Sequence, residues 1–300
     1  MTKYICMVFA GACSYGMLST FVKLAYLEGY TAAGISLLQA AIGMAVLWII
    51  VLISGKGKKM NADLTPILQR YRWLPILLTG AAIGLTTFLY YLSVRYIDAS
   101  LAVVLLMQFA WMGVLMNWLI YKQKPAPLQL LIIAMIIAGT IMASGIFNTN
   151  NVALSIRGIL YALASAVLYA IYIVANGSVG HTMNSMKKSA IIMTGSAAGI
   201  FIVNAHDLIL NTPFDFHILK WAVFLSLFGT IIPPVLFAKG IPKIGAGISS
   251  LIMTVELPVA VVFAHFVLRE KADLLQWIGI AVMVLALILL NLQKTKRFNN

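Results

Sequence analysis

The sequence predicts an all-α integral membrane protein with ten transmembrane helices, arranged as two inverted five-helix repeats. Three observations support this fold class: an apolar composition, ten long hydrophobic stretches and a weak similarity between the two halves. Hydrophobic residues make up 62% of the 300 positions and charged residues only 10%, whereas about a quarter of a soluble domain is charged. We therefore expect no soluble catalytic domain.

Ten apolar stretches have the length of roughly 20 residues that a helix needs to cross a bilayer. In chain order they are 4–26, 32–54, 73–94, 98–121, 127–147, 155–176, 187–206, 220–238, 244–267 and 273–292. Their apolar residues do not alternate with a period of two, which argues against a β-barrel. The first stretch is longer than the core of a signal peptide and has no clear cleavage site, so we expect a retained helix.

The repeat appears when residues 97–129 are paired without gaps with residues 244–276. Only 6 of these 33 pairs are identical, among them Ile97 with Ile244 and Lys124 with Lys271. The match is strengthened because each half contains five predicted spans. An odd number of spans gives the second copy the opposite orientation in the membrane. We expect a first repeat over 1–150 and a second over 151–300, divided at the polar loop 148–151.

The basic residues predict how the chain is oriented in the membrane. With the N-terminus in the cytoplasm, 15 of the 21 lysines and arginines fall on the inner side and 6 on the outer side. The positive-inside rule therefore places both termini in the cytoplasm. The net charge of +13 then lies against anionic lipid headgroups, and we expect no nucleic-acid partner.

Glu256 is the acidic residue that lies deepest in a predicted span, and it adjoins Pro258. A carboxylate at the centre of a span costs about 3 kcal/mol to insert, so Glu256 should face the interior of the bundle. It is a candidate for proton coupling or substrate binding, or it forms a neutral contact between helices. Pro258 should leave the Thr254 carbonyl free and bend the helix, and Pro233 and Pro234 are further candidate kinks.

Other polar and aromatic side chains lie within the spans rather than at their ends. We predict that they line a cavity for a small amphipathic molecule, while aromatic core packing and interhelical hydrogen bonds remain the alternatives. The candidates besides Glu256 are Tyr15, Gln39, Tyr90, Tyr91, Gln108, Trp111, Tyr169 and Tyr172. The glycine pairs Gly80/Gly84 and Gly195/Gly199 should allow close packing of helices within the molecule.

Catalytic and cofactor motifs do not stand out. The run GKGKK at 55–59 lacks the spacing of a phosphate-binding loop. We expect no metal, because no set of His, Cys, Asp and Glu has ligand spacing, and we expect no cofactor and no enzymatic activity. Without an ATP-binding element, any active transport would use a gradient.

Several short motifs, in order along the whole chain, resemble the EamA-type transporters of the drug/metabolite transporter superfamily. Tyr15-Gly16 followed by Lys23 is similar to the Trp-Gly and Lys of the first helix in that family, with Tyr in place of Trp. Residues 94–102 resemble the entry to its fourth helix. Glu256-Leu257-Pro258, 268–270 and 276–279 resemble its E-P, L-G-E and Q-W-x-G motifs, with Leu257 inserted and Arg269 in place of Gly.

This resemblance implies a ten-helix carrier in a bacterial-type inner membrane, with a central cavity between the halves. It implies export of amino acids or related small metabolites by alternating access, with protons as the candidate coupling ion. Uptake of a vitamin or nucleoside-like compound is one alternative, and a non-transporting scaffold or complex subunit is another. The sequence leaves the substrate, the direction of flux and the oligomeric state open.

Overall fold

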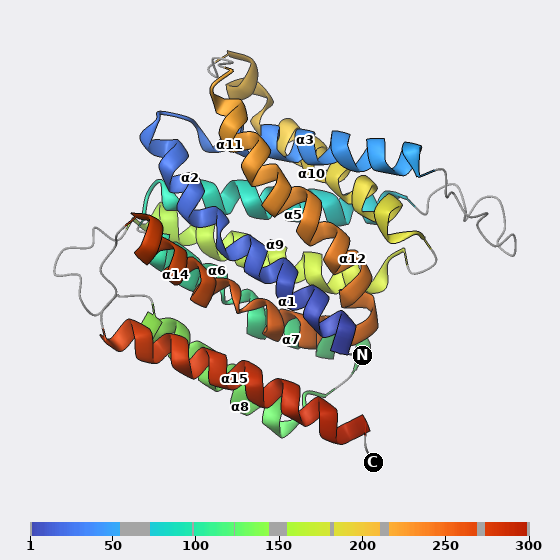
Figure 1. The fold of residues 1–300 in the computed structure, drawn as a ribbon, viewed down its shortest axis with the longest axis vertical. Helices are drawn as coiled ribbons and strands as arrows, with labels where there is room; N and C mark the ends of the chain where they lie inside the picture. Colours follow the sequence, from blue (N-terminus) through green and yellow to red (C-terminus); the bar gives the residue numbers. More distant parts are fainter. Residues whose placement is uncertain are drawn as a thin grey trace, which may run out of the picture.

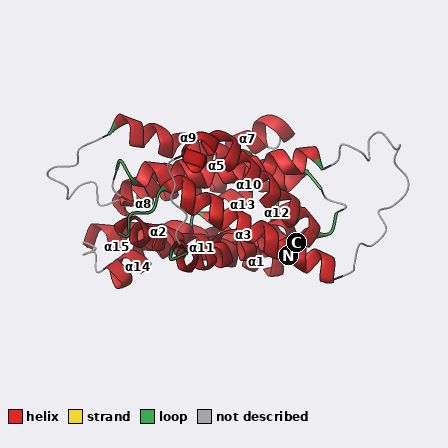
Figure 2. Cartoon of the chain, turned by 90° about the horizontal axis from the view of Figure 1, so that it is seen from above, coloured by secondary structure: helices red, strands yellow, loops and turns green. Residues whose placement is uncertain are grey.

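The computed structural model describes residues 2–54, 73–97, 99–122, 124–143, 155–180, 183–210, 216–268 and 274–298, and within these ranges the chain contains helices and no strands. The helices lie side by side along one direction (Figures 1 and 2). They are α1 (Thr2–Gly16), α2 (Leu18–Leu27), α3 (Ala32–Ile53), α5 (Leu74–Val94), α6 (Ala99–Leu106), α7 (Phe109–Tyr121), α8 (Pro127–Ala143), α9 (Ile156–Ser178), α10 (Ser185–Leu210), α11 (Ile218–Leu225), the π-helix η2 (Ser226–Ile231), α12 (Ile232–Ile244), α13 (Ala246–Met253), α14 (Glu256–Leu268) and α15 (Leu274–Phe298).

The predicted all-helical membrane fold is confirmed. Eight helical stretches are long and apolar enough to cross a bilayer, and two shorter apolar stretches at 127–142 and 274–286 account for the fifth and tenth predicted spans. Most observed ends lie within four residues of the prediction. The eighth and tenth spans each continue six residues further, to Ile244 and Phe298. The predicted end of the fifth span at 147, the loop 148–151 and the run 55–59 lie outside the described residues.

Four of the ten spans are not regular helices throughout, which the hydrophobic pattern did not predict. The first span divides into α1 and α2 at Met17, the fourth into α6 and α7 at 107–108, and the ninth into α13 and α14 at 254–255. The eighth contains the six-residue π-helix η2, which separates α11 from α12. Such irregularities in a membrane helix commonly accompany functional sites.

The two halves have matching helix boundaries in the region where the sequence repeat was found. The helices α6 and α13 begin at Ala99 and Ala246, which are paired in the gapless alignment, and α8 and α15 begin at the paired positions Pro127 and Leu274. The breaks at 107–108 and 254–255 are also paired. The weak sequence similarity therefore corresponds to a repeated local structure.

Contacts between these two regions show that α7 of the fourth span and α13 of the ninth span run in opposite directions. In α7, Gly113 lies against Ser250 of α13, and one turn later Asn117 lies against Gly247. The residue number rises along α7 while it falls along α13, so the two helices are antiparallel. This is the relation that an inverted repeat requires.

The three prolines predicted to bend helices lie at helix starts, and one expectation about them was wrong. Pro258 is the third residue of α14, where a missing N–H group is tolerated. The Thr254 carbonyl is not free as expected, because it accepts a hydrogen bond from the Leu257 N–H at 3.1 Å. Pro233 and Pro234 begin α12 directly after the π-helix.

Glycines bring α5 and α10 into backbone contact, as the two Gly-x-x-x-Gly pairs predicted. A Cβ atom at Gly80 would collide with the Ile192 carbonyl, and one at Gly195 with the Leu77 carbonyl. The same two helices also contact each other at Gly84, which lies against Ser196. Small residues allow this short distance between the two helix backbones. The close approach increases van der Waals contact, which holds helices together in lipid because the hydrophobic effect does not act between them there.

The helices α8 and α15 pack against each other along one edge of the bundle (Figure 1). The core lies among the remaining helices, where the largest completely buried side chains include Tyr91, Tyr169, Tyr172, Phe109 and Phe237. The start of α1 and the end of α15 lie at the same end of the bundle (Figure 1), which agrees with an even number of spans.

Candidate functional site

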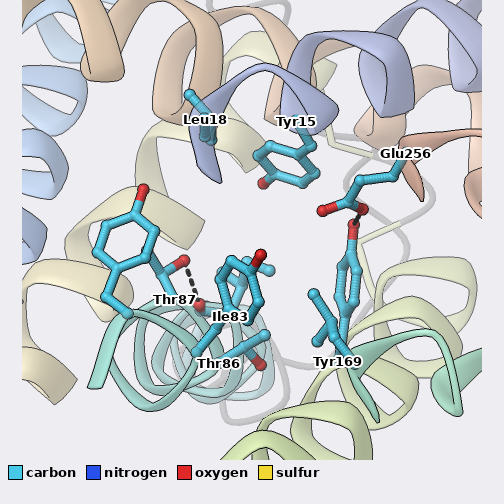
Figure 3. A pocket seen from close by; sticks show the side chains of 10 residues that line it. Tyr15, Leu18, Ile83, Thr86, Thr87, Tyr169 and Glu256 are labelled. Atoms are coloured by element: carbon cyan, nitrogen blue, oxygen red, sulfur yellow. Dashed lines mark hydrogen bonds between the residues drawn. The ribbon is translucent and has the colours of Figure 1, made fainter. Parts of the chain in front are cut away.

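A cavity lies where the three broken spans approach one another, between helices from both halves of the chain (Figure 3). About 40 Å³ of it is open to the centre of a water molecule, which is space for a few waters. The lining residues are Tyr15, Leu18, Ile83, Thr86, Thr87, Tyr90, Tyr91, Leu106, Tyr169 and Glu256.

The helix breaks place several of these residues. Tyr15 and Leu18 lie on either side of the break at Met17, Leu106 is the last residue of α6, and Glu256 is the first residue of α14. The end of α1 can approach the start of α14 because Gly16 has no side chain, and a Cβ atom there would lie 2.5 Å from the Glu256 carbonyl oxygen.

Glu256 is buried and points into the cavity between Tyr15 and Tyr169 (Figure 3). The Tyr169 hydroxyl donates a hydrogen bond to Glu256 Oε2 at 3.4 Å, which is long for an O–H···O contact. Among the lining residues that the structure describes, Glu256 carries the only ionisable carboxyl group, and none is Lys, Arg or His.

Aromatic rings form much of the remaining surface and the layer behind it. Tyr15 meets Tyr169 edge-on at a centroid distance of 6.2 Å and Phe237 at 5.5 Å. Tyr169 also contacts Phe109 at 4.5 Å and stacks with Tyr172 at 6.2 Å. Edge-on and offset contacts of this kind stabilise the positions of the rings beyond their buried area.

A stripe of α5 supplies half of the lining. Ile83, Thr86, Thr87, Tyr90 and Tyr91 recur at the spacing of one helix face. The two threonine hydroxyls donate to the carbonyls of Ala82 and Ile83 in their own helix, at 2.8 and 3.0 Å. The sequence reasoning missed Leu18, Ile83, both threonines and Leu106, although the i, i+3, i+4, i+7 pattern on α5 was a usable signal for three of them.

Gln39 and Tyr172 lie behind the cavity rather than on its surface. Tyr91 donates its hydroxyl to Gln39 Oε1 at 2.9 Å, and the Gln39 carbonyl accepts from Thr230 of η2 at 2.9 Å. Tyr172 is buried beside Tyr169 and accepts a hydrogen bond from Asn176 Nδ2 at 3.2 Å. Both residues therefore support lining residues.

Gln108 and Trp111 do not line this cavity. Gln108 lies in the break between α6 and α7, where its Nε2 donates to the Val104 carbonyl at 3.1 Å. Its Oε1 accepts from Trp111 Nε1 at 2.9 Å. This pair satisfies polar groups that the break would otherwise leave unpaired in hydrocarbon.

Lys188 is a buried lysine at the start of the seventh predicted span. It is 1% exposed in the first turns of α10, and its Nζ donates to the Asn176 carbonyl in the last turn of α9 at 2.7 Å. A cation near a helix C-terminus interacts favourably with the unpaired carbonyls there. The contact joins α9 to α10 at the end of the hairpin they form.

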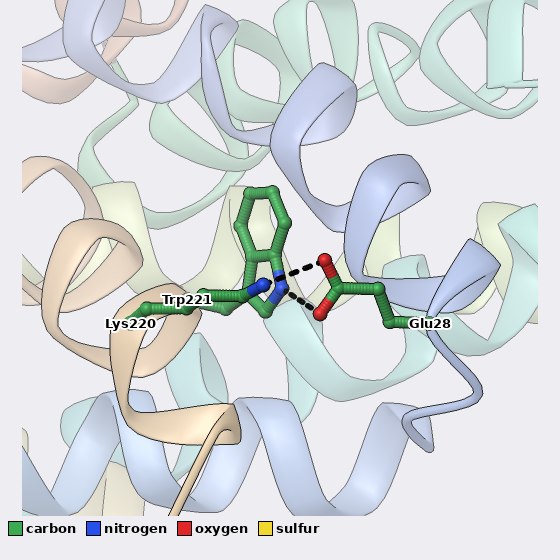
Figure 4. A network of polar contacts seen from close by, with 3 residues as sticks. All are labelled: Glu28, Lys220 and Trp221. Carbon is green, nitrogen blue, oxygen red and sulfur yellow. Dashed lines mark hydrogen bonds and ion pairs between the residues drawn. The ribbon is translucent and has the colours of Figure 1, made fainter.

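One exposed ion pair links the two halves away from the cavity (Figure 4). Glu28, which follows α2, accepts from Lys220 Nζ and Trp221 Nε1 of α11 at 2.7 and 2.8 Å. The Lys220 ammonium, and next the Trp221 indole, lower the pKa of the Glu28 carboxyl below its usual value.

In the described ranges, no three His, Cys, Asp or Glu side chains lie close enough together to hold a metal ion. The two cysteines do not form a disulfide; Cys6 is exposed and Cys13 is half-buried.

Comparison with known proteins gives one family match in two copies. The model of the EamA-like transporter family matches residues 2–145 and again 156–292. The chain is 24% identical over 279 residues to "Uncharacterized transporter YcbK" of Bacillus subtilis (strain 168), covering 90% of this chain and 86% of the relative.

Two further matches agree with this result. "Uncharacterized transporter sll1319" of Synechocystis sp. is 24% identical over 229 residues, which are 73% of this chain and 68% of the relative. A solved structure titled "Crystal structure of protein" superposes with a TM-score of 0.70 at 17% identity, covering 95% of this chain and 98% of that one. At this identity the likeness concerns the fold.

Proposed function

Because the chain belongs to the EamA-like transporter family, we propose that it is a secondary carrier that moves small organic metabolites across the membrane by alternating access. The proposed direction is export across a bacterial-type plasma membrane, and the proposed cargo is an amino acid or related compound. The two family matches correspond to the proposed repeats 1–150 and 151–300, with the second inverted relative to the first. Such repeats give one site two equivalent ways of opening.

The observation that carries the proposal is the cavity between the halves. It combines a buried carboxyl, several tyrosine hydroxyls and aromatic rings, which is the mixture expected where a small amphipathic molecule binds. The cavity also lies at breaks in three spans, and discontinuous helices are typical of transporter binding sites. The cavity has space for a few waters, so its walls must separate to admit an organic substrate.

If both termini lie in the cytoplasm, as proposed, the positions of the lining residues suggest which side of the carrier is closed. Four of the five lining residues of α5 lie in its second half, which is then the outer half. On the inner side, α1 packs against α12, where Gly240 contacts Val8, and α7 packs against α13 at Gly113 and Ser250. We propose that this conformation is closed toward the cytoplasm, with its cavity nearer the outer face.

Glu256 is the proposed coupling group. The titratable groups that face it are the tyrosine hydroxyls of Tyr15, Tyr90, Tyr91 and Tyr169, which retain their protons near neutral pH. The carboxyl is therefore the lining group that can gain or lose a proton during a cycle. A substrate that displaces this proton would be exchanged against it, so a pH gradient would drive flux.

Reconstitution of the purified chain tests the proposal. Liposomes that contain it should move a substrate identified by thermal stabilisation, and a pH gradient should accelerate this flux. Glu256→Gln should abolish this acceleration of flux over about pH 5–8. Glu28 stays ionised throughout this pH range, so its own titration does not interfere with the comparison. Glu28→Gln is the matched control and should retain it. Flux that responds to the gradient equally in both variants would remove Glu256 from coupling.

A further inference from the structure

We infer that the substrates of this cavity are organic monocations with an aromatic or other flat apolar group, such as arylalkyl ammonium compounds. The inference rests on the proposed transport function. From amino acids and related compounds it selects the relatives that carry the ammonium group without a carboxylate. It follows from three properties of the described lining: its charge, its ring surfaces and the partners of its carboxyl group.

The charge of the lining comes first. Glu256 supplies one carboxyl, and none of the described lining residues is basic. A buried carboxylate is costly unless a positive charge or several hydrogen bonds compensate it. A cationic substrate provides this compensation, whereas a zwitterion or an anion brings a second carboxylate for which the lining offers no positive partner.

The carboxyl group has capacity left for such a partner. Its described hydrogen bond is the one from the Tyr169 hydroxyl to Oε2, at 3.4 Å. A carboxylate can accept about four hydrogen bonds, and the group points into the cavity rather than into a helix contact (Figure 3). An ammonium group beside Oε1 would therefore occupy an unfilled position.

The rings provide the second half of the recognition. Tyr15 and Tyr169 lie on either side of the carboxyl (Figure 3), and Tyr90 also lines the cavity. The faces of aromatic rings attract cations, and this attraction is strongest where water is excluded. The same rings offer flat apolar surface to an aryl group. Ile83, Leu18 and Leu106 add apolar surface without introducing charge.

A set of four probes with the same phenyl ring and different charge tests the inference on the unchanged full chain. They are phenethyltrimethylammonium as permanent cation, phenylalanine as zwitterion, 3-phenylpropionate as anion and 2-phenylethanol as neutral compound. Titration calorimetry of the purified protein in detergent should show the cation binding at least tenfold more tightly than each of the others. Tighter binding of phenylalanine or 3-phenylpropionate, or no binding of the cation, would overturn the inference.

Variants then locate the binding. Glu256→Gln should weaken binding of the cation at least tenfold, and Glu256→Asp, which keeps the charge, should restore part of it. Glu28→Gln should bind as the unchanged protein does. If Glu256→Gln does not fold, the Asp variant and the four-probe comparison on the unchanged chain still decide the outcome. Equal affinity in the folded Gln variant would contradict a role for the carboxyl.

Counterflow in proteoliposomes separates this inference from the proposed transport function. Accumulation of the cation supports both. Accumulation of phenylalanine with exclusion of the cation supports transport and overturns the cationic class. Selective binding of the cation without flux of any probe supports the selectivity of the site and contradicts the carrier function.

Discussion

At the scale of single residues, the cavity concentrates its chemistry on one carboxyl group surrounded by tyrosines. Tyr169 has two separable roles there, because its hydroxyl donates to Glu256 at 3.4 Å while its ring packs against Phe109 and Tyr15. A long hydrogen bond contributes little, whereas the buried ring contributes much through packing. Substitutions that remove these parts one at a time should therefore differ strongly.

Tyr169→Phe should keep the melting temperature in detergent close to that of the unchanged protein and alter ligand affinity less than about tenfold, since a neutral hydrogen bond contributes about 1 kcal/mol. Tyr169→Ala should destabilise the protein by about 3–5 kcal/mol, because it leaves a cavity in the core. Thermal unfolding followed by intrinsic fluorescence compares the two. Equal destabilisation would show that the hydroxyl, rather than the ring, secures this region.

Sequence reasoning identified many of the residues around the cavity, for a physical reason. Tyr15, Tyr90, Tyr91, Tyr169 and Glu256 all line it, because polar groups within an apolar span must face the interior of the bundle. The same reasoning could not separate lining from support. Gln108 and Trp111 satisfy each other at a helix break, and breaks are not visible in a hydrophobic pattern.

At the scale of helices, the break before Glu256 does not depend on Pro258. In the gapless pairing, Trp111 stands where the second half has Pro258, and yet α6 and α7 are also separated at the equivalent positions. The breaks are therefore features of the repeated structure, which tertiary packing maintains.

Pro258→Ala should consequently leave the break in place. We expect a change in stability within about 1 kcal/mol, because proline in the first turn of a helix interrupts no helical hydrogen bond. Thermal unfolding and flux in liposomes measure the effect. Loss of flux in a variant that folds normally would show that this proline itself is needed to keep the two segments apart.

The contact between α5 and α10 allows a prediction with a matched control. Gly80→Ala should destabilise the protein by about 1–3 kcal/mol or more, because the added methyl group would collide with the Ile192 backbone carbonyl. At Gly177 in α9 the nearest neighbour of an added Cβ atom is 3.5 Å away. Gly177→Ala should therefore be neutral or slightly stabilising. Melting temperatures of the two variants in the same detergent provide the comparison.

At the scale of the whole molecule, the ten spans were predictable because ten stretches of apolar residues can be stable only inside a membrane. The repeat was also visible, although just 6 of 33 paired residues are identical, since the register of the two halves is unbroken there. The contacts between halves were not predictable. The Glu28–Lys220 pair joins residues 192 positions apart, and an apolar pattern does not encode such pairs.

This pair should respond to acid but not to changes near neutral pH. Lys220 and Trp221 lower the pKa of Glu28 in the folded protein. The contribution of the contact is therefore present above the ordinary carboxyl pKa of about 4.3 and is lost as the pH falls through the lowered value. Thermal unfolding of Glu28→Gln and of the unchanged protein should be compared from about pH 7 to pH 3. The difference between their melting temperatures should be constant near neutral pH and should decrease only in acid. A difference that varies between pH 6 and 8 would contradict this assignment.

The small volume of the cavity matters for the membrane as an electrical insulator. About 40 Å³ is open to water and is lined in part by Tyr169, and behind it Tyr172, Phe109 and Phe237 are almost completely buried. A continuous chain of water molecules across the protein would let protons leak through the membrane and dissipate its electrical potential. The packed rings behind this small cavity interrupt such a chain. Many copies of the carrier can therefore be present in the membrane without lowering the voltage across it.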